Sequence, residues 1–173
     1  MRSVNFIGFL IGGAFLLFIS SPISAQNLRA DLEAFQEVPA VSSPATGQFR
    51  ARVIKNSSIE YTLTYKGLEA DATQAHIHFG QEGVNGGIVV FLCQAATADP
   101  TGLAPQCPLR EGTVSGTLTA ANLAPNTQAQ GQGIEEASAP VFAELLRAIR
   151  EDVTYANVHT TKFPSGEIRG QIR

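Results

Sequence analysis

Short runs in which every second residue is apolar recur along most of this chain. The first covers residues 28–34, where charged residues fill the positions between the apolar ones. Because side chains of a strand point alternately to its two faces, such a run predicts a strand with one buried and one wet face. Similar or continuous β-branched and aromatic runs cover residues 47–54, 58–65, 72–79, 88–92, 113–119, 154–160 and 167–172. Eight short strands separated by turn residues predict an all-β fold, an antiparallel sandwich or barrel.

One segment has helical spacing instead. Its apolar residues are Val141, Phe142, Leu145, Leu146 and Ile149. Ser138 stands at the N-cap position and Pro140 in the first turn, so we expect a short helix near residues 139–150. We expect this helix to close one end of the sandwich by packing, and residues 122–136 to form a loose loop before it.

Residues 1–25 differ in composition from the rest of the chain. Arg2 is their only charged residue, residues 4–19 are almost wholly apolar, and Pro22 and the small Ala25 follow. This pattern predicts a signal peptide cleaved after Ala25; an uncleaved membrane anchor is the alternative. Residues 26–173 then form a single domain that is secreted or lies in the periplasm or cell envelope, with no stable membrane span after cleavage.

Charge and cysteine content narrow the function further. The chain has 12 Lys and Arg against 15 Asp and Glu, without a basic run, which excludes a typical nucleic-acid-binding protein. Cys93 and Cys107 are the only cysteines. In an oxidising compartment they are expected to close the irregular segment between them by a disulfide bond. The alternative, a metal site, is less well supported because their spacing matches no CxxC motif.

The three histidines fall in two short segments. His76 and His78 lie on a predicted strand and point to one face, and His159 lies on another predicted strand with Asn157 on the same side. If these strands are neighbours, three imidazoles share one patch that suits copper or zinc. The alternative is polar residues on a solvated face, or histidines bonded to nearby backbone.

The glycine-rich segment 80–87 follows the first two histidines. A strand comes after it, not a helix, so it lacks the helix N-terminus of a phosphate-binding loop. The pair Asn85-Gly86 predicts a tight turn in a hairpin that hangs beside the histidines. No catalytic residue is predicted, because the chain has no GxSxG motif and its carboxylates are scattered. Glu167 and Arg169 are expected in solvent on the last strand; with Asn157 they are candidate accessory residues.

Five segments together resemble the CHRD domain, a module named for chordin and widespread in exported bacterial proteins. They are LEAFQEVP (32–39), YKGL (65–68), AHIH (75–78) with the glycines that follow, YANVHT (155–160) and FPSGEIRGQ (163–171). The similarity covers residues 28–172, although the family more often has Val where Ala156 stands. It implies a Greek-key β-sandwich of immunoglobulin or superoxide-dismutase type, and its recurrent histidines correspond to His76, His78 and His159.

The resemblance implies a fold and not a reaction. AHIH is similar to the copper-ligand strand of copper-zinc superoxide dismutases, but those enzymes need further histidines and this chain has three in all, so dismutase activity is not expected. Two hypotheses remain. One is an exported binding module that holds copper or zinc, or recognises an extracellular or cell-envelope protein or matrix partner. The other is an enzyme with a single His-ligated metal ion and an open position for a small ligand.

Overall fold

The computed structural model describes residues 26–95, 99–124, 132 and 138–173. Its strands are β1 (Gln26–Glu33), β2 (Thr46–Ile54), β3 (Ser58–Lys66), β4 (Ala72–Phe79), β5 (Gly87–Gln94), β6 (Gly112–Leu118), β7 (Thr154–Thr160) and β8 (Ile168–Gln171). The helices are the 3₁₀ turns η1 (Ala34–Gln36) and η2 (Ala120–Asn122) and the α-helix α1 (Ala139–Arg150). The all-β prediction with one short helix is confirmed, and the strand ends agree with the expected runs to within about two residues.

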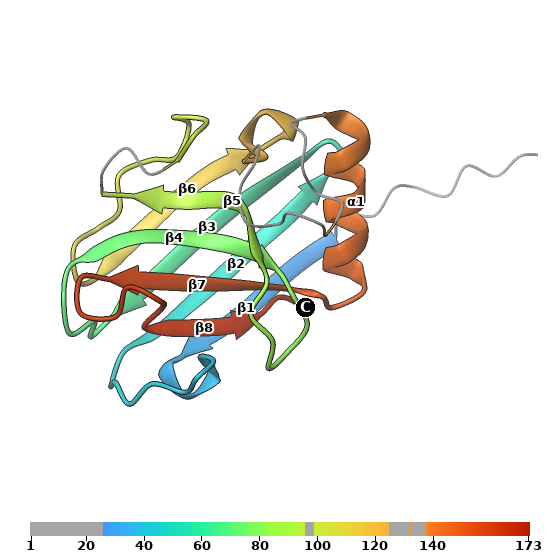
Figure 1. Ribbon diagram of the computed structural model, residues 1–173. Helices are drawn as coiled ribbons and strands as arrows, with labels where there is room; N and C mark the ends of the chain where they lie inside the picture. The colour runs from blue at the N-terminus through green and yellow to red at the C-terminus, as the bar shows by residue number, and fades with distance from the viewer. Residues whose placement is uncertain (1–25, 96–98, 125–131, 133–137) are drawn as a thin grey trace, which may run out of the picture.

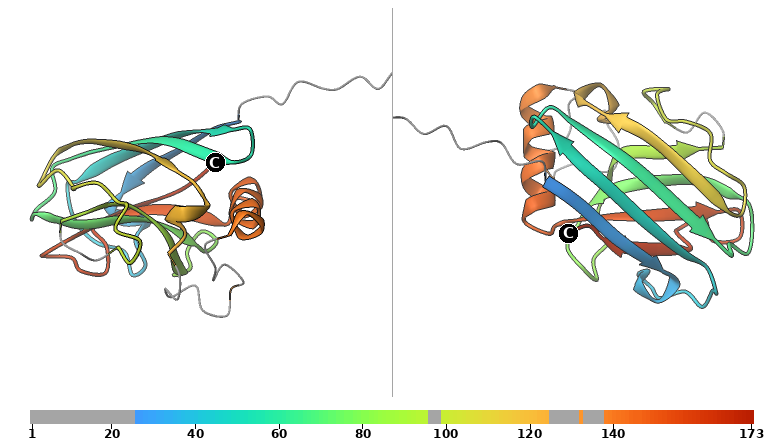
Figure 2. Two further views of the ribbon diagram at one scale, coloured as in Figure 1. Left: turned by 90° about the horizontal axis from the view of Figure 1, so that it is seen from above. Right: turned by 180° about the vertical axis from the view of Figure 1, so that it is seen from behind.

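The strands form one antiparallel sheet in the order β5-β4-β7-β8-β1-β2-β3-β6. This sheet folds over on itself into two layers, β5-β4-β7-β8 and β1-β2-β3-β6 (Figures 1 and 2). The link between the layers is narrow: Glu33 of β1 pairs with Arg169 of β8, and Arg29 exchanges two backbone hydrogen bonds with Arg173. The result is a flattened, nearly closed barrel with two broad outer faces.

The core lies between the two layers. Every second residue of β2 and β3 points inward, and Phe49 and Leu63 are completely buried there. They face the inner residues of the other layer, such as Ile77 and Val158, which are equally buried. The Tyr61 hydroxyl of β3 donates a hydrogen bond to the Leu92 carbonyl of β5, 2.6 Å away, so its burial leaves no donor unpaired.

Helix α1 covers one end of the two layers (Figure 2). Its apolar face, including Phe142, Leu145 and Leu146, is buried, as expected for a packing helix. Ser138 precedes the helix and its carbonyl accepts the first backbone bond from Phe142 N–H, but its side chain makes no cap hydrogen bond. The predicted loop before the helix lies mostly outside the described residues.

A cysteine pair fastens the segment between β5 and β6. The sulfur atoms of Cys93 and Cys107 are 2.05 Å apart, at disulfide distance, as predicted. The backbone of Gln94 bonds to that of Pro105 and Cys107, which holds this segment against β5. The predicted signal peptide, residues 1–25, lies outside the described residues; in the rest, no helix is long and apolar enough to cross a membrane.

Candidate metal site

Neighbouring strands bring the three histidines together. His76 and His78 lie on β4, and β7 pairs with β4 in a register that places Gln74 opposite His159 and His76 opposite Asn157. The residues between them, such as Ile77, point into the core between the layers. Strand alternation therefore directs all three imidazoles to the outer face of the β5-β4-β7-β8 layer.

The three rings converge on one point. One ring nitrogen from each histidine can be chosen so that all lie within 4.8 Å of one another. Nδ1 of His76 is 3.1 Å from Nε2 of His159, and the centroids of the His76 and His78 rings are 5.3 Å apart. Ligands of one ion at about 2.0–2.1 Å must lie within about 4 Å of one another, so a small ring movement completes a three-nitrogen site.

Backbone carbonyls fix two of the rings. Nδ1 of His78 donates to the Gly86 carbonyl at 2.9 Å, and Nδ1 of His159 donates to the Pro164 carbonyl at 3.0 Å. A carbonyl only accepts, so the proton of each neutral ring lies on Nδ1 and the lone pair on Nε2. Nε2 atoms of His76 and His78 are buried and, in the described part of the chain, have no hydrogen-bond partner. Lone pairs oriented in this way are typical of metal-binding histidines.

The histidines are buried, which the sequence did not predict. His76 is completely buried, and His78 and His159 are 6% and 7% exposed. The Phe91 ring packs edge-on against His76 at 4.5 Å, and the Tyr155 ring stacks on His78 at 4.7 Å. The alternative of a solvated face was wrong, because neighbouring rings and the segment after β4 cover these polar side chains. The other alternative, histidines bonded to nearby backbone, holds for His78 and His159.

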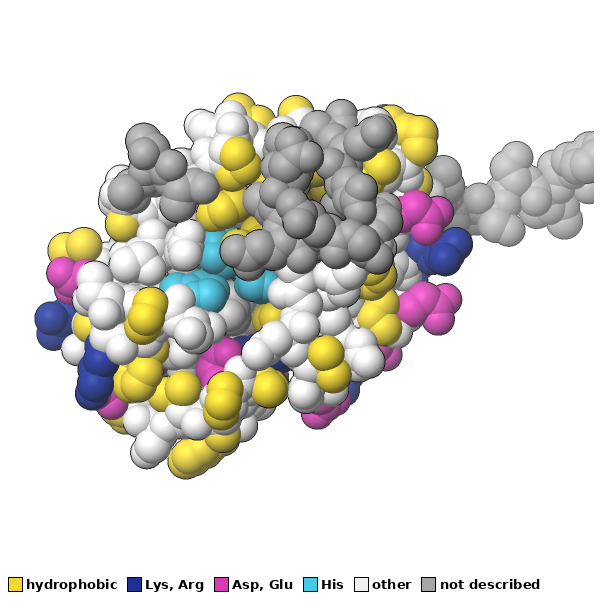
Figure 3. Space-filling model, in the orientation of Figure 1, with side chains coloured by type: hydrophobic (Ala, Val, Ile, Leu, Met, Phe, Trp, Pro, Cys, Tyr) yellow, Lys and Arg dark blue, Asp and Glu magenta, His cyan; other side chains and the backbone are white. Residues whose placement is uncertain are grey.

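Burial also sets the charge of the rings. It lowers the pKa of His78 to about 4 and, together with the neighbouring histidines, that of His76 well below its ordinary value. Burial lowers the pKa of His159 as well, against the opposing effect of its bond to Pro164. All three imidazoles are therefore neutral at neutral pH, the form that binds metal ions. Figure 3 shows them in a hollow of the outer face, with acidic and basic side chains close by.

The site consists of residues from two sequence motifs, Ala75–His78 and Asn157–Thr160. The chain matches the family model for the CHRD domain over residues 28–172, and these motifs lie within that match. The protein belongs to the CHRD domain family. No curated protein and no solved structure matches it. In this CHRD domain the histidines expected from the resemblance are the ones that the fold brings together.

Two further groups of the CHRD domain adjoin the histidines. The side-chain oxygen of Asn157 is 3.0 Å from Nε2 of His159. Glu37, which follows η1, is 6% exposed, and its Oε1 has no hydrogen-bond partner in the described part of the chain. Burial raises the pKa of Glu37 to about 7, although Arg169 and a hydrogen bond from Asn157 act in the opposite direction. Gly166 makes room for it, since a Cβ there would lie 2.4 Å from Oε1.

Sequence reasoning missed Glu37. Alternation carries no information about it, because it lies after a strand in an irregular segment. Its only signal is its position in the Leu32–Pro39 segment of the family resemblance. The structure shows it as the buried carboxyl group linked to the histidines through Asn157.

Arg169 holds the segment that covers His78. Its guanidinium lies 3.4 Å above the Tyr155 ring and donates to the carbonyls of Gln81 and Val84 and to the side chain of Asn85. Because Gly86 at the end of this segment accepts from His78, Arg169 positions the histidine indirectly. The expectation that Arg169 lies in solvent was wrong: it is 2% exposed.

The turn between β4 and β5 lies earlier than predicted. Val84 N–H bonds to the Gln81 carbonyl, and Gly83, with φ +76°, takes the left-handed conformation that the turn needs. The prediction of a tight turn at Asn85-Gly86 was wrong. Gly86 instead allows a close approach, since a Cβ there would lie 1.8 Å from the Phe79 carbonyl oxygen. The segment thus reaches the histidines, as expected of a hairpin that hangs beside them.

Glu167 is buried as well, and the expectation that it lies in solvent was wrong. Its carboxylate accepts hydrogen bonds from Ser43 Oγ, Thr160 Oγ1 and the backbone N–H of Glu69. None of these bonds reaches a histidine. Glu167 therefore joins three segments at the end of β7 and does not belong to the histidine cluster.

Proposed function

We propose that this CHRD domain binds one transition-metal ion, copper or zinc, through His76, His78 and His159. The observation that carries the proposal is the pair of Nδ1–H bonds that leave the Nε2 lone pairs of His78 and His159 available to an ion, in a cluster where one nitrogen of each ring lies within 4.8 Å of the others. Buried ring nitrogens without partners cost free energy unless a ligand satisfies them. An ion shared by the three rings gives the Nε2 lone pair of His78 a partner.

The donor set limits the choice of metal. Three neutral imidazoles suit Cu and Zn and lack the oxygen ligands that Ca²⁺ and Mg²⁺ prefer. By the general order of stability, Cu²⁺ binds such a site more tightly than Zn²⁺. Three protein ligands leave a fourth position for water or a small ligand.

The cellular setting belongs to the same proposal. A cleaved leader at residues 1–25 and a disulfide between Cys93 and Cys107 both fit an exported protein in an oxidising compartment. The domain then acts as a binding module of the cell envelope or the extracellular space. Intact mass of the exported protein tests this part: the chain is expected to begin at Gln26.

A second candidate is a mononuclear metal enzyme, and Glu37 favours it. A buried carboxyl group with a pKa near neutrality is the group that general acid-base catalysis needs. The side chain of Asn157 lies between this carboxyl group and His159: it hydrogen-bonds to Glu37 and lies 3.0 Å from the ring. Turnover by the metal-loaded protein that is lost in Glu37→Gln, with metal affinity retained, separates the enzyme from the module.

Metal binding is tested on protein exported without a histidine tag. Metal content of the purified protein and calorimetric titration with Cu²⁺ and Zn²⁺ give identity and affinity, and electron paramagnetic resonance of the Cu²⁺ form reports nitrogen ligands. We expect one ion per chain and several nitrogen ligands. Gln74→Ala, on the same strand and face as His76, is the matched control and retains affinity. A wild type that binds neither ion contradicts the proposal.

A further inference from the structure

Two arginines on the outer face of the layer that lacks histidines are direct neighbours, and a third, Arg173, which follows β8, lies beside one of them. Arg29 of β1 lies directly opposite Arg50 of β2, and Arg29 also exchanges backbone hydrogen bonds of 2.8 and 2.9 Å with Arg173. Arg29 and Arg50 are exposed. Like charges directly opposite each other on antiparallel strands destabilise a sheet. This row therefore needs a source of negative charge.

Acidic residues supply it only at the ends of the row. Arg173 pairs with Glu82 at 2.7 Å. Arg52, two positions after Arg50 on the same face, pairs with Glu60 at 3.1 Å. Neither pairing reaches the central two guanidinium groups. The charge of Arg29 and Arg50 is left without a salt bridge in the described part of the chain.

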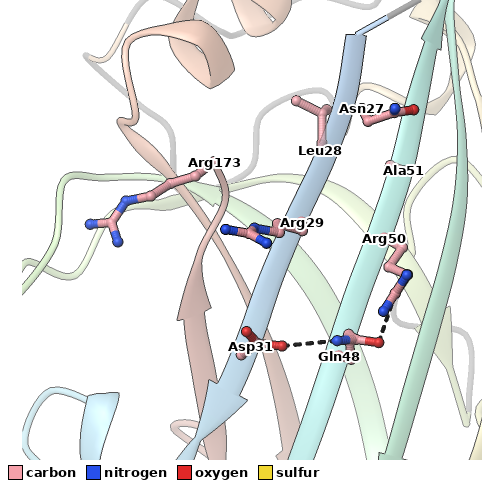
Figure 4. Close-up of a pocket in the computed structure, with 8 residues that line it drawn as sticks. All are labelled: Asn27, Leu28, Arg29, Asp31, Gln48, Arg50, Ala51 and Arg173. Carbon is pink, nitrogen blue, oxygen red and sulfur yellow. Dashed lines mark hydrogen bonds between the residues drawn. The ribbon is translucent and has the colours of Figure 1, made fainter.

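A chain of hydrogen bonds orients Arg50 without neutralising it. Its Nε donates to Gln48 Oε1 at 2.7 Å, and Gln48 Nε2 donates to Asp31 Oδ1 at 3.0 Å. Figure 4 shows this chain along β1 and β2, with the terminal amino groups of Arg50 outside it. These groups, and the guanidinium of Arg29, have no side-chain partner among the described residues. The Asp31 carboxylate accepts from Gln48 and forms no salt bridge with either arginine among the described residues.

The arginines border a hollow. It has a volume of about 750 Å³ and is lined by Arg29, Arg50 and Arg173 and by a single acidic residue, Asp31 (Figure 4). A hollow with an excess of guanidinium groups attracts anions. Guanidinium groups bind tetrahedral oxyanions through paired N–H bonds, and two of them match a dianion in charge.

We propose that Arg29 and Arg50 form a binding site for a phosphate dianion, either free phosphate or the terminal phosphate of a monoester. A dianion between the two strands turns their mutual repulsion into two attractions. A single carboxylate compensates only one of the two charges. The site is independent of the metal proposal, because it lies on the opposite layer and shares no residue with the histidine cluster.

The test is a titration of the protein with inorganic phosphate and, separately, with glucose 6-phosphate, at constant ionic strength and pH 7.5. Backbone NMR signals of β1 and β2 report binding. We expect saturable shifts confined to these strands. Loss of a hydrogen bond to a charged group weakens binding by about tenfold or more, so Arg29→Gln and Arg50→Gln should each do so. Arg52→Gln, which is paired with Glu60, is the matched control and retains affinity. Saturation by the ester indicates a phosphate carried by a larger ligand, and saturation by inorganic phosphate alone a free ion.

A second readout needs no ligand. Without phosphate, Arg29→Gln and Arg50→Gln should raise the melting temperature, because each removes a like-charge contact, whereas Arg52→Gln should not. Shifts that never saturate, or an Arg52→Gln variant that loses as much affinity as Arg50→Gln, would mean general charge screening and overturn the proposal.

Discussion

On the outer face of β3, Thr62 and Thr64 are exposed, whereas on the outer face of β7, Asn157 and His159 are buried. The two strands belong to opposite layers of one folded sheet, and both present their alternate residues away from the core. They differ in what lies above them. Nothing in the described part of the chain covers Thr62, but the segment after β4 and the turn at Pro164 bond to the histidines beside β7.

This difference indicates where a binding site is expected in such a fold: on the face whose polar side chains are covered. Polar groups on the outer face of β3 keep their contact with water, so their identity matters little to stability. Polar groups on the outer face of β7 have lost that contact, and each needs a partner within the protein or a ligand. The buried Nε2 atoms of His76 and His78 have no hydrogen-bond partner in the described part of the chain, and they therefore support the proposed ion more strongly than their identity as histidines does.

Of the changes that compare the two faces, loss of a metal ligand is expected to have the largest effect, a fall in metal affinity. His78→Gln keeps a polar side chain of similar volume but removes the oriented imidazole. Removing a ligand itself should cost more than the ~10–100-fold in affinity that loss of a second-shell partner costs. Calorimetric titration with Cu²⁺ measures it, and near-ultraviolet circular dichroism checks that the variant folds. Thr62→Ala, on the uncovered face, should leave the affinity unchanged; equal affinity in both variants contradicts the site.

Acidification should destabilise the metal-free protein through the buried His78 ring. Above pH 6.5, His78 is neutral in both folded and unfolded chains and contributes nothing to the pH dependence. Below pH 6.5 the unfolded chain binds a proton that the folded chain does not bind until about pH 4, so the free energy of unfolding falls with pH across this window. For a shift of this size the loss reaches about 3 kcal/mol.

Urea unfolding between pH 4 and 8 measures this loss. The Glu37→Gln background is needed, because Glu37 titrates in an overlapping range with the opposite sign. The matched comparison is Glu37→Gln with and without His78→Gln. Identical slopes for the two proteins would show that His78 is not kept neutral by burial.

Alternation predicted the strands well because it reports which residues of a strand share a face. It placed His76 and His78 together, and the family pattern added His159. It could not show that this face is covered, since the cover comes from irregular segments whose path depends on contacts distant in sequence, such as Arg169 with Val84. For the same reason Arg169 and Glu167 were expected in solvent, and Glu37 was missed.

Glu37 allows the covered and uncovered faces to be compared through the pH dependence of stability that one side chain causes. Its pKa is about 7 in the folded protein, so the folded chain holds a proton between pH 4.5 and 7 that the unfolded chain has lost, and stability falls as pH rises through this range. Glu37→Gln imitates the protonated group. Its stability relative to wild type should rise from near zero at pH 4 to at most about 3 kcal/mol at pH 8. Thr62→Ala, on the uncovered face and exposed, removes no titratable group and is the control; it should show no such trend.

The smallest expected effect compares two polar side chains, one from each outer face. Asn157→Ala removes a buried amide that lies beside His159 and donates a hydrogen bond to Glu37, and the groups left unpaired should cost about 1–3 kcal/mol in the free energy of unfolding. Thr62→Ala removes an exposed hydroxyl and should change it by less than about 0.5 kcal/mol. Urea unfolding of both metal-free variants at pH 7 measures the difference. Equal costs would mean that water reaches the face of β7 as freely as that of β3, and the histidine nitrogens without partners would then no longer support the proposal of a bound ion.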